Sequence, residues 1–302
     1  MRGHTLTVIF TAPHPNPAAH LAGEGLFCGI SERFITPNLI DPNLNMEYVT
    51  YTPLPSLFSS AMRARATRCM PGSEVVILLL SGALNPPHRG HIGALQHAWR
   101  HLEARGVRVL GGLLTPPSDM YILHKQSKSR DDDVLTLTAA DRLHLARAAV
   151  SEHPGLDVCA WESEQIAASW PGGPGYPEFF DVVQNVSAQA QTTFEHLAIR
   201  VLYVCGGDLP DRQFMQRLVK EKQVSLCVIT RCNDGELPKT PAGRELASAD
   251  GNFLLPAVPD AGTFSSTAVR VALAARDYAS ARRMLGNSVF SCMARMGLTE
   301  DH

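Results

Sequence analysis

Hydrophobic and polar positions alternate along the chain in blocks that predict strands followed by helices. The clearest block runs from Val75 to Leu80, six apolar residues in succession. Such a run is too short to span a membrane, and it suits a strand that is buried on both faces. A turn of small residues and prolines follows, and apolar residues then recur at helical spacing from Ile92 to Leu102. This strand, loop and helix organise the rest of the prediction.

The same alternation continues toward the C-terminus and predicts an α/β fold. We expect a Rossmann-like parallel sheet flanked by helices, with a helical C-terminal part. Further strands are expected at residues 107–115, 156–161, 201–205, 224–230 and, as a short one, 253–255. Helices are expected at residues 90–105 and 178–197, from Thr138 with its capping partner Asp141, and from 265 to 296. Loops are expected at residues 118–137, 170–177 and 232–251.

Residues 1–73 differ in character and are expected to form an irregular N-terminal extension to a domain at residues 74–298. Frequent prolines leave little room there for long elements. Two explanations stay open: a partly ordered segment that covers or tethers the domain, or a true start of translation at Met70. Targeting to an organelle is disfavoured, because acidic residues interrupt any amphipathic stretch.

Composition narrows the class of protein. The chain has 302 residues, 45% of them hydrophobic, which is enough to bury a sizeable core. A formal net charge of −2 provides no basic surface for nucleic acid. The 7 cysteines are scattered and odd in number, which argues against a disulfide framework and against a zinc site. With no signal peptide or membrane span expected either, we predict a soluble intracellular protein without nucleic-acid or membrane partners.

The loop and helix start after the first strand contain residue types that bind phosphate groups. His88 and His91 stand three residues apart, which places them on one face of a helix, and Gly90 has no side chain to obstruct a ligand. A helix N-terminus adds N–H groups and a positive dipole. The alternative is two polar histidines on the exposed start of an ordinary helix. Ligands of open α/β sheets bind directly after a strand, and this position favours the phosphate site.

A second predicted helix start, Phe264–Arg270, has the same character. The hydroxyl groups of Ser265, Ser266 and Thr267 can accept hydrogen bonds from N–H groups at the start of the helix. Arg270 projects from the first turn, and hydroxyls, N–H groups and a guanidinium together suit a phosphate. A plain N-cap with a surface arginine is the alternative.

The segment SGALNPPHRGH resembles the first signature of the H-x-G-H nucleotidyltransferases, and specifically of nicotinamide/nicotinate mononucleotide adenylyltransferases of the eukaryotic type. The segment Ser265–Arg270 is similar to the family's I-S-S-T-x-x-R. In fragments, the similarity runs from about Glu74 to Leu298. The resemblance implies transfer of the adenylyl group of ATP to nicotinamide mononucleotide (NMN), forming NAD and pyrophosphate, with nicotinate mononucleotide as a second candidate substrate. It also implies Mg²⁺ bound with the ATP phosphates, without a metal site made by protein alone.

The resemblance assigns roles to individual residues. It gives catalytic roles to His88, His91 and Arg270. It gives ATP binding to Gly82, Ala83, Leu84, Lys125, Gly206, Asp208, Arg231, Ser265, Ser266 and Thr267, and NMN binding to Tyr121, Trp161 and Glu162. Judged without the resemblance, Gly206–Asp208 is a turn, Arg231 is a solvent-exposed arginine at a strand end and Trp161 is a core residue.

The chain departs from the family pattern at two places. The family has adjacent lysines after its D-A-Y tyrosine, whereas this chain has His124 and Lys125, either of which could take that role. The family's second substrate-stacking tryptophan has no counterpart, and Phe214 is the only aromatic residue nearby.

Other functions stay open as alternatives. One is another H-x-G-H nucleotidyltransferase, of the pantetheine-phosphate or cytidylyl type; another is a non-catalytic nucleotide-binding or chaperone-like module. A Rossmann dehydrogenase is disfavoured, because the first strand is not followed by G-x-G-x-x-G. Formation of a homo-oligomer and the compartment, cytoplasmic or nuclear, are left open.

Overall fold

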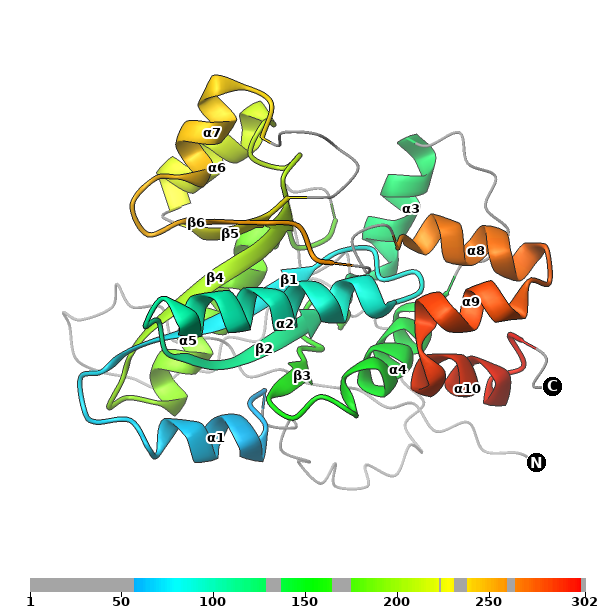
Figure 1. The fold of residues 1–302 in the computed structure, drawn as a ribbon, viewed down its shortest axis with the longest axis horizontal. Helices are drawn as coiled ribbons and strands as arrows, with labels where there is room; N and C mark the ends of the chain where they lie inside the picture. The colour runs from blue at the N-terminus through cyan, green and yellow to red at the C-terminus, as the bar shows by residue number, and fades with distance from the viewer. Residues whose placement is uncertain are drawn as a thin grey trace, which may run out of the picture. The chain divides into compact units, whose positions relative to one another are not determined.

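Parallel strands form a 6-stranded sheet in the order β3-β2-β1-β4-β5-β6 (Figure 1). The computed structural model describes residues 57–128, 137–164, 175–222, 224–230, 238–259 and 264–299. The strands are β1 (Glu74–Ser81), β2 (Val109–Thr115), β3 (Leu156–Val158), β4 (Ala198–Gly206), β5 (Ser225–Ile229) and β6 (Phe253–Leu255). The strand order reverses at β1, which pairs with β2 on one side and with β4 on the other. Ligands of doubly wound sheets bind at the carboxyl edge of such a switch point.

Helices cover both faces of the sheet, as the sequence predicted. They are α1 (Ser60–Ala66), α2 (Arg89–Ala104), α3 (Asp119–Lys128), α4 (Ala139–Val150), α5 (Phe179–Thr193), α6 (Gln213–Lys222), α7 (Pro241–Ala247), α8 (Ser266–Ala274), α9 (Tyr278–Leu285) and α10 (Asn287–Arg295). One hydrophobic cluster joins the sheet to α2, α4 and α8–α10, and a second joins it to α1, α5, α6 and α7. No helix among the described residues combines the length and the hydrophobicity needed to cross a bilayer.

The central strand is buried on both faces, as its unbroken run of apolar residues predicted. Val76, Leu78 and Leu80 belong to the first cluster, whereas the intervening Val75, Ile77 and Leu79 belong to the second. Successive side chains of a strand point to opposite faces, so a strand between two helical layers needs apolar residues at every position.

Two segments that were expected to be loops contain helices, and both expectations are wrong. The segment 118–137 contains α3, and the segment 232–251 contains α7. Helix α7 begins with ordinary signals, since Thr240 caps it and Pro241 occupies its first turn, but its sequence is too polar and too short to show a helical period. The helical C-terminal part expected at residues 265–296 is confirmed and consists of three helices. Arg276 and Gly286, with φ angles of 55° and 86°, interrupt it, because a left-handed residue ends a helix.

Helix α1 lies in the stretch that the sequence assigned to the extension, and it packs against the sheet. Met62 is completely buried and Phe58 is 2% exposed. Gly111 of β2 leaves room for this contact, since a Cβ atom there would lie 2.7 Å from the Met62 side chain. On the same helix, the Arg65 guanidinium lies over the Trp99 ring and donates to Glu103. Residues 57–69 therefore share a core with the sheet, and the position at which the domain begins stays a prediction.

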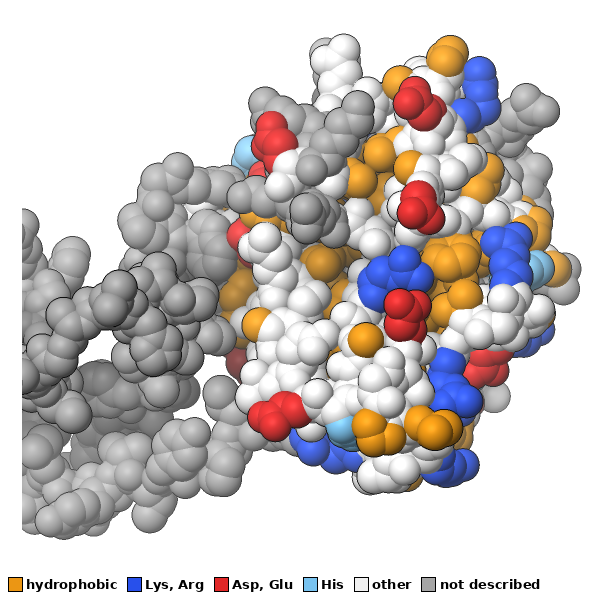
Figure 2. Space-filling view, turned by 90° about the vertical axis from the view of Figure 1, so that its left-hand side faces the viewer, with side chains coloured by type: hydrophobic (Ala, Val, Ile, Leu, Met, Phe, Trp, Pro, Cys, Tyr) orange, Lys and Arg blue, Asp and Glu red, His pale blue; other side chains and the backbone are white. Residues whose placement is uncertain are grey.

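Charged side chains of both signs are interspersed on the face of the described chain that Figure 2 shows. That distribution is in line with the formal net charge of −2.

Replacing Met62 by alanine should destabilise the protein by about 2–5 kcal/mol, because the change leaves a cavity under α1. The matched control is Met70→Ala, at a methionine that is 75% exposed, and it should change stability by less than about 0.5 kcal/mol. Urea unfolding followed by circular dichroism measures both effects. Equal losses from the two variants would contradict the packing of α1 described above.

Candidate active site

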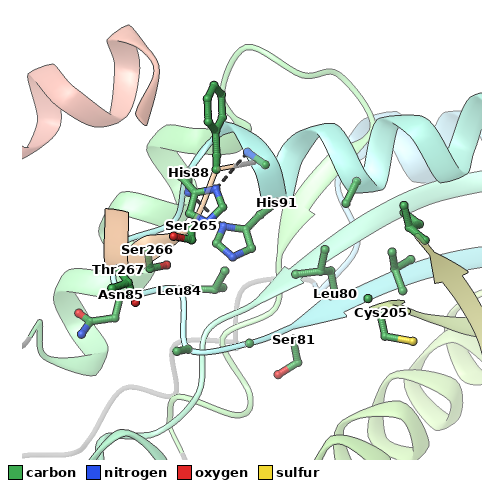
Figure 3. Close-up of a pocket in the computed structure, with 18 of the residues that line it drawn as sticks. Leu80, Ser81, Leu84, Asn85, His88, His91, Cys205, Ser265, Ser266 and Thr267 are labelled. Atoms are coloured by element: carbon green, nitrogen blue, oxygen red, sulfur yellow. Dashed lines mark hydrogen bonds between the residues drawn. The ribbon is translucent and has the colours of Figure 1, made fainter. Parts of the chain in front are cut away.

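A pocket of about 540 Å³ lies at the carboxyl ends of β1, β4 and β5 (Figure 3). The start of α2 and the start of α8 both line it, so the structure places the two predicted phosphate-binding segments in one cleft. Helix α3 contributes a third wall. The predicted site residues that line the pocket are Gly82, Ala83, Leu84, His88, His91, Lys125, Gly206, Ser265, Ser266, Thr267 and Arg270.

His88 and His91 form the N-terminal cap of α2. His88 precedes the helix, and its Nδ1 accepts a hydrogen bond from the Gly90 N–H at 3.1 Å. The Nδ1 of His91 accepts from the His88 N–H at 3.1 Å, and the two ring centroids are 3.8 Å apart. Because each Nδ1 is an acceptor, the proton of each neutral ring sits on Nε2. Backbone bonds thus set both rings in the tautomer that presents an Nε2–H donor.

The start of α8 is bound to the loop that precedes α2. The Ser265 hydroxyl caps α8 by accepting from the Ala268 N–H at 3.1 Å. Ser266 Oγ donates to the Pro86 carbonyl at 2.9 Å, and Arg270 donates to the Asn85 carbonyl at 2.7 Å. These bonds hold the two helix starts on either side of the same cleft.

The loop between β1 and α2 is held in an unusual backbone conformation. Leu84 has a φ of 46°, which a leucine rarely adopts, and its side chain is completely buried. The side chain of Asn85 accepts from the Leu137 N–H at 3.2 Å. Backbone strain of this kind persists where surrounding packing enforces it, and it is concentrated at functional sites.

The polar side of the pocket favours anions. Among the described residues that line it, none is an aspartate or a glutamate, whereas Lys125 and Arg270 are cations. Burial lowers the pKa of Lys125, and the positive charges of Arg270 and Arg212 lower it further. A bound anion would relieve this repulsion, because an opposite charge stabilises the protonated amine.

Lys125 and His124, which were alternatives in the sequence, have different surroundings. Lys125 lines the pocket, whereas the His124 ring lies 5.6 Å from the ring of Tyr176. Geometry therefore favours Lys125 as the residue that meets a ligand in this pocket.

Several predicted site residues do not line the pocket. Asp208 is 57% exposed and pairs with Arg212, with 3.5 Å between the carboxylate oxygen and the guanidinium nitrogen. Trp161 packs against the second hydrophobic cluster. Tyr121 packs edge-on against Tyr176, with 5.4 Å between ring centroids. Arg231 lies outside the described residues.

Glu162, predicted to bind NMN, is buried behind the wall of the pocket. Its carboxylate accepts from Thr115 Oγ1 at 2.6 Å and from Ser81 Oγ at 2.9 Å, and its exposure is 3%. Burial raises the pKa of Glu162 to about 7, although the bonds from Thr115 and Ser81 and the charge of Arg142 oppose that rise. Glu162 thus joins the carboxyl ends of β1 and β2 directly below the loop that lines the pocket.

Sequence reasoning missed the apolar side of the pocket. Phe264 precedes the second signature and Ile229 precedes Arg231, but the sequence assigned neither of them a role in a ligand site. Val258 follows β6 and carries no sequence signal that would have identified it. These side chains, together with Leu80, Ala94 and Val204, form a surface suited to a flat, weakly polar group.

The comparisons with known proteins agree on one group of relatives. No protein-family model matches the chain. A nicotinamide/nicotinic acid mononucleotide adenylyltransferase from Arabidopsis thaliana is 27% identical over 137 residues, 44% of this chain and 50% of that protein. The protein of the same name from Oryza sativa subsp. japonica is 32% identical over 146 residues, 46% of this chain and 51% of that protein. The chain is a distant homologue of these adenylyltransferases.

A solved structure shows the same fold. Plasmodium falciparum nicotinic acid mononucleotide adenylyltransferase complexed with APC matches with a TM-score of 0.50 and 11% identity, over 74% of this chain and 96% of that chain. The chain spans about half the length of the curated adenylyltransferases it matches. Homology therefore supports the resemblance found in the sequence, while the likeness to the solved adenylyltransferase concerns the fold.

Gly82→Ala should separate ligand binding from folding. A Cβ atom at Gly82 would meet no protein atom within 4 Å, so the methyl group would occupy open space in the pocket. We expect stability to stay within about 1 kcal/mol of the native value. Affinity for ATP, the expected ligand, should fall roughly tenfold, because the methyl group overpacks the bound state. Thermal unfolding and titration calorimetry measure the two effects; unchanged ATP affinity would mean that the ligand lies away from Gly82.

Glu162 should make stability fall as pH rises. Its pKa is about 7 when folded, against an ordinary value of 4.5. Between these pH values the folded protein binds the proton and the unfolded chain releases it, so the free energy of unfolding decreases with pH. The loss should reach about 3 kcal/mol by pH 8. Urea unfolding at pH 5 and pH 8 measures it, and Glu162→Gln should remove most of this difference. A pH dependence that survives the substitution would contradict the assignment.

Proposed function

We propose that the protein transfers the adenylyl group of ATP to nicotinamide mononucleotide, forming NAD and pyrophosphate. The observation that carries the proposal is the pocket in which two helix N-termini, two histidines and two cations converge without an opposing carboxylate among the described lining residues. Such a set of donors suits a polyphosphate, which an acidic residue in the same place would repel. Distant homology to mononucleotide adenylyltransferases supports the same assignment.

The two sides of the pocket suit the two parts of ATP. The phosphates would lie between the starts of α2 and α8, within reach of the Nε2–H groups of His88 and His91 and of Arg270. The adenine would lie against the apolar side, which includes Ile229 and Phe264. Lys125, from α3, would add a positive charge to the phosphate end.

The reaction needs little acid–base chemistry. A phosphate oxygen of NMN attacks the α-phosphorus of ATP, a new P–O bond forms, and the bond to the β-phosphate oxygen breaks to release pyrophosphate. The nucleophile is already anionic, so no side chain has to remove a proton from it. Catalysis would then consist of placing the two phosphates and neutralising the charge that develops, which is the task of His91, His88 and Arg270.

Magnesium would enter the site as part of the ATP complex. The described lining residues supply nitrogen donors, hydroxyls and amides but no carboxylate, so the phosphate oxygens would provide the charged ligands for Mg²⁺. Bound there, Mg²⁺ would neutralise charge on the leaving pyrophosphate.

NMN would bind toward α3 and the segment that follows β3. Tyr121 and Trp161 are the candidate contacts there, since a flat cationic pyridinium stacks well on aromatic rings. Glu162 would act through Ser81, because it is buried behind the pocket wall. Nicotinate mononucleotide is the second candidate substrate.

A coupled assay for NAD formation from NMN, ATP and Mg²⁺ tests the proposal. Nicotinate mononucleotide, phosphopantetheine and choline phosphate are assayed in parallel with the purified full chain. A rate of NMN turnover well above the rates with phosphopantetheine and choline phosphate supports the proposal. ATP binding without turnover of any acceptor would instead favour a non-catalytic nucleotide-binding module.

His91→Ala should lower the rate of NAD formation about a hundredfold or more, because it removes a donor to the phosphates. His91→Asn refines the test, since its side-chain oxygen can still accept the His88 N–H bond that caps α2. Both variants should lose activity, and the asparagine variant should keep more of the thermal stability. His144→Ala, at an exposed histidine of α4, serves as the control. Near-normal turnover by the alanine variant would remove His91 from the mechanism.

A further inference from the structure

Helix α3 brings side chains to the pocket although it makes only sparse contacts with the other helices and strands of the described chain. Figure 1 shows it projecting from the body of the fold. Nevertheless Ile122, Lys125 and Gln126 of α3 line the pocket. Besides the packing of Tyr121 and His124 against Tyr176, the position of Lys125 therefore depends on the interactions that fix the start of this helix.

A buried arginine provides the main polar connection to that start. Arg142, on α4, is completely buried. Its guanidinium donates to the Pro117 carbonyl at 2.9 Å and to Asp119 Oδ1 at 3.0 Å, and it also donates to the Leu137 carbonyl. Pro117 and Asp119 lie at the beginning of α3, whereas Leu137 lies just before α4. The Arg142 side chain thus connects the beginning of α3 to the residue that precedes the cap of α4.

The same arginine is linked to the loop between β1 and α2. The backbone of Leu137 accepts from Arg142 and donates its N–H to the Asn85 side chain at 3.2 Å. The Asn85 carbonyl in turn accepts from Arg270 at 2.7 Å. The position of the Arg142 guanidinium is therefore determined by elements that also build the pocket, and it gives α3 a fixed anchor.

Asp119 is the partner through which this anchor acts on α3. A guanidinium removed from water needs an anion or several acceptors to offset the cost of burial, and Asp119 supplies the charge. Asp119 is itself 56% exposed, so its side chain contributes little to the hydrophobic core. Loss of its carboxylate should free the start of α3 without opening a cavity.

We propose that the Arg142–Asp119 ion pair positions α3 and thereby holds Lys125 in the pocket. Asp119 and Arg142 are positioning residues, since neither lines the pocket, and their effect on the reaction passes through Lys125. The expected effect on turnover rests on the proposed adenylyl transfer, whereas the effect on α3 does not.

The first test is hydrogen–deuterium exchange of α3 in the full chain. Asp119→Ala should increase the amide exchange rate of residues 119–128 roughly tenfold, because the free energy of local opening depends on the interactions that hold the segment in place. Exchange in α10 should not change. Glu103→Ala serves as the control. Glu103, on α2, also forms an ion pair with an arginine, Arg65, at 2.7 Å, and neither residue lines the pocket. If α3 exchange is the same in Asp119→Ala as in the native protein, the proposal is overturned.

The second test is a double-mutant cycle with Lys125. Asp119→Ala should lower kcat/KM for ATP roughly tenfold, an effect typical of coupled residues. The Asp119→Ala/Lys125→Ala variant should be no worse than Lys125→Ala alone. Asp119→Asn, which keeps an acceptor, should recover part of the loss. A merely structural role would make the two changes additive, and that result overturns the proposal.

The outcomes separate this inference from the proposed function. If the native protein makes no NAD, the adenylyl-transfer proposal fails, and the exchange measurement still decides whether Asp119 positions α3. If NAD forms but α3 exchange is unchanged in Asp119→Ala, the positioning proposal fails alone.

Discussion

The arrangement of the candidate site depends on two hydrogen bonds that cross from α8 to the loop after β1. Ser266 donates to Pro86 and Arg270 donates to Asn85, residues that are 180 and 185 positions apart in the chain. Both acceptors are backbone carbonyls that the strained turn at Leu84 presents to α8. Each bond is worth only about 1 kcal/mol or a little more in stability, but together they fix the distance between two helix N-termini. That distance decides whether one polyphosphate can contact both.

The sheet makes this meeting possible, and its main features could be predicted from the sequence. A six-residue apolar run can be buried on both faces only in a sheet with two helical layers, and β1 has that position. Once β1 is central, the segment after it lies at the switch point, where His88 and Gly90 were expected to meet a ligand. The resemblance between Ser265–Arg270 and a second phosphate-binding signature placed α8 at the same edge. The two helix starts that line the pocket were therefore the most predictable part of the candidate site.

Other parts depended on contacts that have no local pattern. Helices α3 and α7 were missed, because their sequences are largely polar and each buries only a few apolar side chains, too few to show a helical period. The resemblance gave Glu162 a role in NMN binding, and the structure shows that its carboxylate accepts from the hydroxyls of Thr115 and Ser81. Burial raises the pKa of Glu162, and the spacing of residues along the chain does not reveal that this side chain is buried. Burial also decides the role of Arg142, a charged residue to which the sequence assigned no role and which is completely buried.

The distribution of charge explains why these hidden residues matter. A pocket for a polyphosphate collects donors and positive ends of helices, and in the absence of ligand such groups repel one another. In the described chain the carboxylates that could offset this repulsion lie behind the pocket wall or beyond its rim, at Glu162 and Asp208, and not in the pocket itself. A carboxylate inside would stabilise the empty protein but compete with the phosphate. Hydrogen bonds from the protein backbone instead offset the repulsion between the cations, as where Arg270 donates to the Asn85 carbonyl, and the charge of the pocket is complementary to an anion.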